Sequence, residues 1–263
     1  MLFNFYSRYK TLIKFIKNWP VYLFNKWISH PSIFHFVLRK HAIRISVPKE
    51  TLRVFKEFFM IDGYSIELLK TYLPKNAVVI DIGANIGLFP IRLLMENSDI
   101  KFYSYEPLPN NFEILNENVS RNSFTRNRIS IFNKAVLGKK QDNLKIYFDN
   151  KKNYTDTSSV IPGFENNNDS VEIACTTLEE ICDANQIQNI SLLKLDCEGS
   201  EFSILYDSPI ELIKNIPFIV LEIHDIDTNR NNLNGMKDFL DSLGYSLKIK
   251  PVTSSINMVW AWK

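Results

Sequence analysis

Cysteine is scarce in this chain of 263 residues, and the few cysteines are scattered. The three of them, Cys175, Cys182 and Cys197, form neither a disulfide framework nor a CxxC metal-binding pair. A reducing compartment, the cytoplasm, is the simplest setting for such a protein. With 45% hydrophobic and 23% charged residues, the composition is that of an ordinary globular protein.

Long hydrophobic runs are also missing. The longest uncharged stretch near the N-terminus, Trp27–Leu38, falls well short of the roughly 18 apolar residues that a membrane span requires. Lys10, Lys14 and Lys17 interrupt any apolar core of a signal peptide. We therefore expect a cytoplasmic protein, with association to the inner membrane surface as the only membrane contact.

Acidic residues are absent from positions 1–49, which carry nine Lys or Arg. Residues 50–263 hold the other 22 basic residues and all 29 acidic ones, so the net charge of +2 combines a basic head with an acidic body. We divide the chain accordingly into a basic, aromatic extension (1–49) and a main domain (50–263). Apolar residues at helical spacing predict short helices in the extension, separated at Pro20 and Pro31.

The extension has two main interpretations. A basic amphipathic segment can bind the surface of an anionic membrane, or it can form a helical cap on the main domain or on a second subunit of a homodimer. Basic residues interleaved with aromatics are also compatible with nucleic-acid binding. The acidic body argues against a nucleic-acid partner.

The main domain alternates between strand-like and helix-like segments. Strand patterns occur at 77–82, 101–106, 129–136, 192–195 and 218–223, helical patterns at 50–72, 88–95, 110–121, 177–184, 201–206 and 231–243, and a final pair of strands at 245–250 and 256–262. This order predicts an α/β fold with a mostly parallel sheet and helices on both faces. Residues 138–176 interrupt the rhythm and predict a β-hairpin insertion beside the active site, with an Asn-rich loop at 166–168.

The strongest motif runs from Val78 to Gly87, with the sequence VVIDIGANIG. A buried strand leads into a turn at Gly83, where glycine lets the backbone approach a ligand closely, and Gly87 opens a helix. The middle glycine of GxGxxG is missing, which disfavours a pyrophosphate-binding loop and hence an NAD-dependent oxidoreductase. Glu106 ends the next strand, where a carboxylate can accept hydrogen bonds from ribose hydroxyls. Together these features predict that the ligand is a nucleoside that carries no phosphates.

Two motifs carry a resemblance to a known family. Val78–Gly87 with Tyr105-Glu106-Pro107, and the Leu193–Glu201 segment LKLDCEGSE, resemble the FkbM-type S-adenosylmethionine-dependent methyltransferases. The segments 135–138 and 218–224 are similar to the same family, and the resemblance covers roughly residues 50–225. It implies the class I (Rossmann-like) methyltransferase fold of seven strands, the last one inserted antiparallel.

The resemblance also implies a set of cofactor-binding residues. Around the methionine part of S-adenosylmethionine it places Asp81, Gly83, Asn85 and Gly87. It assigns the ribose to Glu106, the adenine pocket to Pro107, and the adenine edge to the segment from Asn133 to Ala135. Family members mostly methylate hydroxyls, often on sugars or secondary metabolites.

Candidate catalytic residues follow the fourth and fifth strands. Asp196 and Glu198 come directly after the strand at 192–195, and Glu222 and His224 end the next one. Ligands bind at the carboxyl ends of such strands, so we predict Asp196, Glu198 and His224 as catalytic, with Asp196 also contacting the cofactor. Glu198 and Glu201 could instead cap the following helix. We predict no metal, although Asp196, Glu222 and His224 could converge on a divalent ion.

These observations predict an O-methyltransferase acting on a glycan, a lipid-linked sugar or another small molecule. A secondary metabolite or a nitrogen acceptor is the alternative within the same enzyme class. The hydroxyls of Asp156-Thr157-Ser158-Ser159 could bind a polar acceptor, or this segment could be a plain turn.

Overall fold

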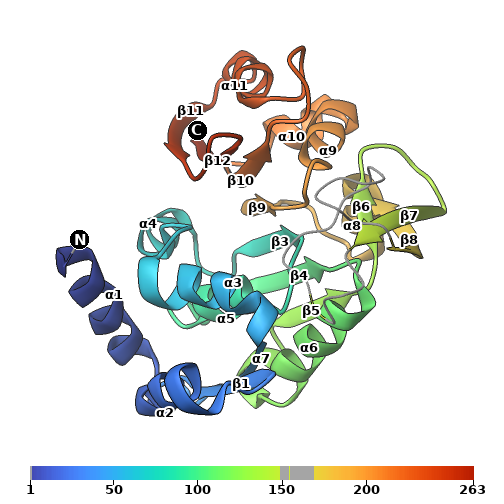
Figure 1. The fold of residues 1–263 in the computed structure, drawn as a ribbon. Coiled ribbons are helices and arrows are strands. Elements are labelled where there is room, and N and C mark those ends of the chain that lie inside the picture. Colours follow the sequence, from blue (N-terminus) through green and yellow to red (C-terminus); the bar gives the residue numbers. More distant parts are fainter. Residues whose placement is uncertain (1, 149–153, 155–168) are drawn as a thin grey trace.

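A computed structural model describes residues 2–148, 154 and 169–263. Its centre is a seven-stranded sheet in which only β12 runs antiparallel to its neighbours (Figure 1). The strands follow the spatial order β11 (Ser246–Pro251), β12 (Ile256–Trp262), β10 (Phe218–His224), β9 (Leu192–Leu195), β3 (Val78–Ile82), β4 (Lys101–Tyr105) and β5 (Ile129–Phe132). The predicted mostly parallel sheet, with its last strand inserted antiparallel, is confirmed.

The two faces of the sheet bury two separate hydrophobic layers. Along β3, Val79 packs into one layer and Ile80 and Ile82 into the other, because successive side chains of a strand point to opposite faces. The first layer is covered by α4 (Ile66–Tyr72), α5 (Leu88–Leu94) and α6 (Pro109–Ser120), and the second by α8 (Leu178–Ala184), α9 (Glu201–Asp207), α10 (Ile210–Lys214) and α11 (Leu233–Ser242). A short helix, α7 (Ser123–Arg126), precedes β5.

The expected third strand at 129–136 is two strands that belong to different sheets. After β5 the chain leaves the central sheet, and β6 (Ala135–Leu137) pairs parallel with β8 (Asp169–Thr177). The β8 strand also pairs antiparallel with β7 (Asn143–Phe148), so the expected hairpin insertion is present as part of a three-stranded sheet. The Asn-Lys step at 133–134 separates two apolar runs that sequence reasoning had joined.

The helix expected over 50–72 is also interrupted. It consists of a 3-10 turn (Lys49–Thr51), α3 (Leu52–Lys56), a π-helical turn (Glu57–Ile61) and α4. Asp62 ends the π-turn with a left-handed φ of 55°, and its carboxylate accepts a hydrogen bond from the Ile66 amide at 2.8 Å. This break takes Tyr64 out of the helix, and its hydroxyl donates a hydrogen bond to Asp196 in the pocket described below.

The extension is helical only in its first half. Helices α1 (Leu2–Phe15) and α2 (Trp19–Phe24) and a π-turn (Asn25–Ser29) are followed by an antiparallel hairpin of β1 (Ile33–Val37) and β2 (Arg44–Pro48). The alternating, β-branched and aromatic character of residues 33–37 suits a strand better than the predicted helix. The free edge of β2 is satisfied by Asn118 of α6 and by Asn122, which lies between α6 and α7. The side-chain amide of each exchanges two hydrogen bonds with the β2 backbone.

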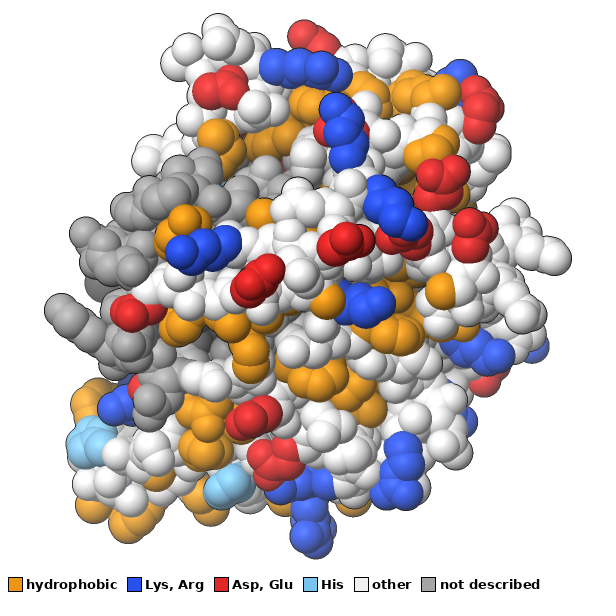
Figure 2. Space-filling view, turned by 90° about the vertical axis from the view of Figure 1, so that its right-hand side faces the viewer, with side chains coloured by type: hydrophobic (Ala, Val, Ile, Leu, Met, Phe, Trp, Pro, Cys, Tyr) orange, Lys and Arg blue, Asp and Glu red, His pale blue; other side chains and the backbone are white. Residues whose placement is uncertain are grey.

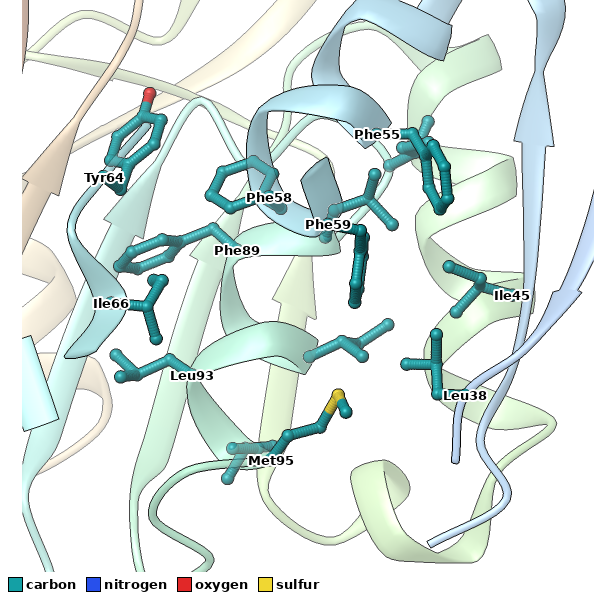
Figure 3. Packing of buried hydrophobic residues seen from close by; sticks show 14 of the residues in the cluster. Leu38, Ile45, Phe55, Phe58, Phe59, Tyr64, Ile66, Phe89, Leu93 and Met95 are labelled. Atoms are coloured by element: carbon teal, nitrogen blue, oxygen red, sulfur yellow. The ribbon is translucent and has the colours of Figure 1, made fainter. Parts of the chain in front are cut away.

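The extension and the main domain share one core. Phe36 of β1 stacks on Phe55 of α3 with ring centroids 4.1 Å apart, and Phe15 of α1 packs against Phe59. Figure 3 shows Leu38 and Ile45 of the hairpin facing the aromatic cluster that α3 and α5 also supply. The guanidinium of Arg92, fully buried on α5, lies 3.9 Å from the centre of the Phe15 ring. The extension is therefore a built-in part of the hydrophobic layer.

No helix among the described residues is both long and apolar enough to span a bilayer.

Shared packing predicts that a substitution in the extension destabilises the whole fold. Phe36 is 2% exposed, so Phe36→Ala should lower the free energy of unfolding by about 3–5 kcal/mol. Phe24→Ala, at a side chain 54% exposed, is the control and should change it by less than about 0.5 kcal/mol. Urea unfolding measures both. Equal, small effects would show that the extension is not part of the core.

Candidate active site

The glycine loop between β3 and α5 is held against the ends of two neighbouring strands. The amides of Gly83 and Ala84 both donate to the carbonyl of Tyr105 at the end of β4, at 3.0 and 2.9 Å. Gly83 has a φ of +76°, and a Cβ there would lie 1.7 Å from the Asp196 carbonyl oxygen. Only glycine allows the loop to approach β9 this closely.

Glu106 supports the same loop from β4. One carboxylate oxygen accepts from the Asn85 amide at 2.8 Å and the other from the Leu108 amide at 3.0 Å. Burial raises the pKa of Glu106 to about 7, although these two hydrogen bonds act to lower it. Each carboxylate oxygen has a second lone-pair direction, so Glu106 can still accept hydrogen bonds from a diol. Its side chain lines the pocket, as the ribose prediction requires.

The pocket opens at the carboxyl ends of β3, β4, β9 and β10. Six of the predicted cofactor residues line it, namely Gly83, Asn85, Glu106, Pro107, Ala135 and Asp196. The other three lie outside the lining. The Asn133 amide donates to the carbonyls of Glu106 and Pro107, Gly87 packs its backbone against Leu115, and Asp81 is fully buried behind the loop.

Asp81 contacts Lys194, a buried lysine on β9. The ammonium lies 3.3 Å from the Asp81 carboxylate and 3.8 Å from that of Asp196, and it donates to the Gly83 carbonyl at 2.6 Å. Burial alone would lower the pKa of Lys194, but the two carboxylates outweigh it and raise that pKa. A charged lysine thus joins the glycine loop to the end of β9. Lys194 belongs to the LKLDCEGSE motif, but the motif alone does not predict this role.

Asp196 faces the pocket as an ionised carboxylate. It accepts a hydrogen bond of 2.6 Å from the hydroxyl of Tyr64, which reaches it from the loop before α4. Burial would raise its pKa, but the charges of Lys194 and His224 and the Tyr64 hydrogen bond lower it. Asp196 is therefore a fixed negative charge at the position where sequence analysis expected the cofactor or acceptor.

His224 and Glu201 connect β10 to the turn after β9. The fully buried Glu201 carboxylate accepts from the amides of Gly199 and His224, at 2.8 and 3.0 Å, and lies 3.1 Å from His224 Nδ1. On the other side of the ring, Nε2 lies 3.3 Å from Glu198 and 3.8 Å from Glu222. Burial would lower the pKa of His224, but Glu201, Glu198 and Asp196 raise it to about 10.

Two further acids in the pocket titrate near neutral pH. Burial, with the repulsion of Asp196, raises the pKa of Glu57 to about 7 and that of Glu222 to about 8. Glu57 begins the π-turn that continues α3, within the helical range expected from the sequence. Arg53, one turn before Glu57, also lines the pocket. The acids thus gather at one end of the pocket.

Three of these residues could hold a metal ion. Asp196, Glu198 and His224 each offer an atom within 4.8 Å of the others, so Glu198 takes the place that sequence analysis gave to Glu222. The same imidazole ring also lies beside the carboxylates of Glu201 and Glu222. The segment 156–159, considered for acceptor binding, lies outside the described residues.

This arrangement has the architecture of a known fold class. A sheet with one antiparallel strand, a glycine loop, a strand-end acid beside the loop and a pocket at the strand ends form the class I methyltransferase fold. The family description "Methyltransferase FkbM domain" matches residues 81–247. The chain belongs to this family, the FkbM methyltransferases.

Curated relatives are distant. The 31-O-demethyl-FK506 methyltransferase FkbM of Streptomyces tacrolimicus is 23% identical over 57% of this chain and 66% of its own length. Methyltransferase 1 of Beauveria bassiana is 21% identical over 75% of this chain and 82% of its own. The AMB antimetabolite synthetase AmbE of Pseudomonas aeruginosa is 23% identical over 76% of this chain, which spans only 11% of AmbE.

Solved structures show the same fold. Methyltransferase FkbM from Methylobacillus flagellatus KT superposes with a TM-score of 0.50 at 15% identity, over 81% of this chain and 54% of that one. The METTL16 methyltransferase domain gives a TM-score of 0.50 at 16% identity, over 82% and 69%.

The charged state of His224 predicts a pH-dependent contribution to stability. A group whose pKa rises from 6.5 to about 10 on folding stabilises fully below the lower value and loses its effect as the pH approaches the higher one. His224→Gln should therefore reduce the free energy of unfolding most near pH 6 and progressively less toward pH 10. Urea unfolding at several pH values measures the difference. The exposed His30, replaced by Asn, is the control, and a His224 effect that does not vary with pH would contradict the assignment.

Proposed function

We propose that this protein transfers a methyl group from S-adenosylmethionine to a hydroxyl of a small molecule, with a glycan or lipid-linked sugar as the favoured acceptor. The observation that supports this proposal is the cluster of Glu57, Asp196 and Glu222 at one end of the pocket. Carboxylates there suit both the sulfonium charge of the cofactor and the proton that a hydroxyl gives up. The name of the Streptomyces relative, 31-O-demethyl-FK506 methyltransferase, agrees with an oxygen acceptor.

The residues present fit the cofactor. Glu106 offers acceptors for ribose hydroxyls, Pro107 and Ala135 supply an apolar wall, and Asp196 supplies a negative charge for the cationic end. When bound, S-adenosylmethionine would supply an electrophilic methyl group on its sulfonium. The larger part of the acceleration should come from alignment of the acceptor oxygen in this pocket.

Glu222 is the residue that we assign as the proton acceptor. It is buried at the end of β10, lines the pocket, and has a pKa of about 8, so its ionised form is available near neutral pH. In our proposal the hydroxyl proton passes to Glu222 as the oxygen forms its bond to the methyl carbon. Asp196 then orients cofactor and acceptor. The pKa of His224 is too high for a general base, so we assign His224 the role of positioning Glu198 and Glu222. Glu198 remains a candidate for contact with the cofactor or the acceptor.

An acceptor panel tests the reaction itself. Matched pairs of sugars that differ only in carrying a hydroxyl or an amino group are incubated with the protein and S-adenosylmethionine, and products are followed by mass. Methyl ethers are the expected products. Methylation confined to the amino members of each pair would replace this proposal with transfer to nitrogen.

Variants of the two titrating acids test the base. With an acceptor that the panel yields, Glu222→Gln should lower kcat by roughly 10²–10⁴ and abolish the rise in rate with pH. Glu57→Gln removes a neighbouring acid of similar pKa and should keep that rise. Binding of S-adenosylhomocysteine by both variants controls for folding. A Glu222→Gln enzyme with the wild-type pH profile would rule Glu222 out as the base.

A further inference from the structure

We propose that the outer side of the extension docks on an anionic lipid bilayer. The surface consists of four apolar side chains on α2 and the π-turn after it, hereafter the outer patch: Val21, Phe24, Trp27 and Ile28. Trp27 and Ile28 are each 68% exposed, and Phe24 is 54% exposed. This inference is independent of the acceptor and of the catalytic residues.

The outer patch is not needed for folding. The core-facing side of the same segment is Tyr22, which is fully buried and packs against Phe34, Phe36 and Phe55. The outer patch falls at spacings of three and four residues, on the opposite side of the helix. In Figure 1, α2 lies at the lower edge of the molecule, away from the central sheet. Its apolar residues thus face outward after the fold is complete.

A group of cations adjoins this apolar surface at Trp27. The Lys26 ammonium lies 5.0 Å from the centre of the Trp27 ring and 3.4 Å from the Tyr9 hydroxyl. Burial, together with the charges of Lys26 and Arg8, lowers the pKa of Lys56, so these three cations lie near one another. The extension contains no acidic residue of its own. By contrast, the face in Figure 2 carries acidic and basic side chains in alternation.

Aromatic and aliphatic side chains flanked by cations match the interface of an anionic membrane. Trp and Phe enter the boundary between headgroups and acyl chains, while Lys and Arg meet lipid phosphates and carboxylates. A symmetric dimer through the same surface would oppose cation to cation. Nucleic acid would leave Val21 and Ile28 without an apolar partner. The combination of charge and apolar exposure therefore favours a lipid surface.

Vesicle sedimentation of the full chain tests the proposal. The protein should pellet with vesicles of phosphatidylcholine and phosphatidylserine, bind vesicles of phosphatidylcholine alone at least about tenfold less, and be released by salt. The double variant Phe24→Ser, Trp27→Ser should lose at least about tenfold in binding. Ile249→Ser with Val252→Ser, at exposed apolar residues of the C-terminal segment, is the matched control and should bind as the wild type does.

A charge variant separates the electrostatic contribution of the cations from the contribution of the apolar side chains. Lys26→Glu should weaken binding, whereas Lys237→Glu on α11 should not. Thermal unfolding of each variant checks that the fold is intact. Equal binding to both vesicle types, or no binding, would overturn the proposal. So would a change in oligomeric state or in RNA binding, rather than in vesicle binding, when the outer patch is replaced.

Discussion

The buried ammonium of Lys194 is the contact on which the rest of the site depends. It is fixed by the Gly83 carbonyl and by the carboxylates of Asp81 and Asp196, at the point where β3 and β9 end side by side. A buried charge is tolerated only when it is paired and hydrogen-bonded. The same contact therefore closes the glycine loop on β9 and holds Asp196 ionised toward the pocket. Asp81, expected to meet the cofactor, is fully buried against this lysine.

From Lys194 outward, the acids of the pocket form two groups with different chemistry. In the first group, Asp196, Glu198 and Glu201 surround His224 and keep its imidazole protonated, so these carboxylates are paired with a positive charge. Glu57 and Glu222 are left with raised pKa values because burial and Asp196 disfavour their ionised forms. A pocket that combines the ionised Asp196 with the titrating Glu57 and Glu222 can hold a cation and also accept a proton.

Local sequence was sufficient to predict the glycine loop and the residues at the strand ends. The run VVIDIGANIG predicts a strand, a turn and a helix because glycine and apolar spacing act locally, and strand-end positions correctly bring Asp196, Glu198, Glu222 and His224 to one edge of the sheet. What the sequence could not supply depends on distant contacts. Tyr64 reaches Asp196 from the break that follows Asp62, and the hairpin of the extension depends on the amides of Asn118 in α6 and of Asn122 just after α6.

The central claim is that the acidic end of the pocket is matched to a cationic methyl donor. Isothermal titration in buffers of different ionisation enthalpy tests it most directly, by comparing S-adenosylmethionine with S-adenosylhomocysteine, whose thioether sulfur carries no charge, between about pH 7 and 8. A sulfonium beside Glu57 and Glu222 should lower the pKa of both acids and release protons on binding, and the thioether should release far fewer. Equal proton release by the two ligands would contradict the account.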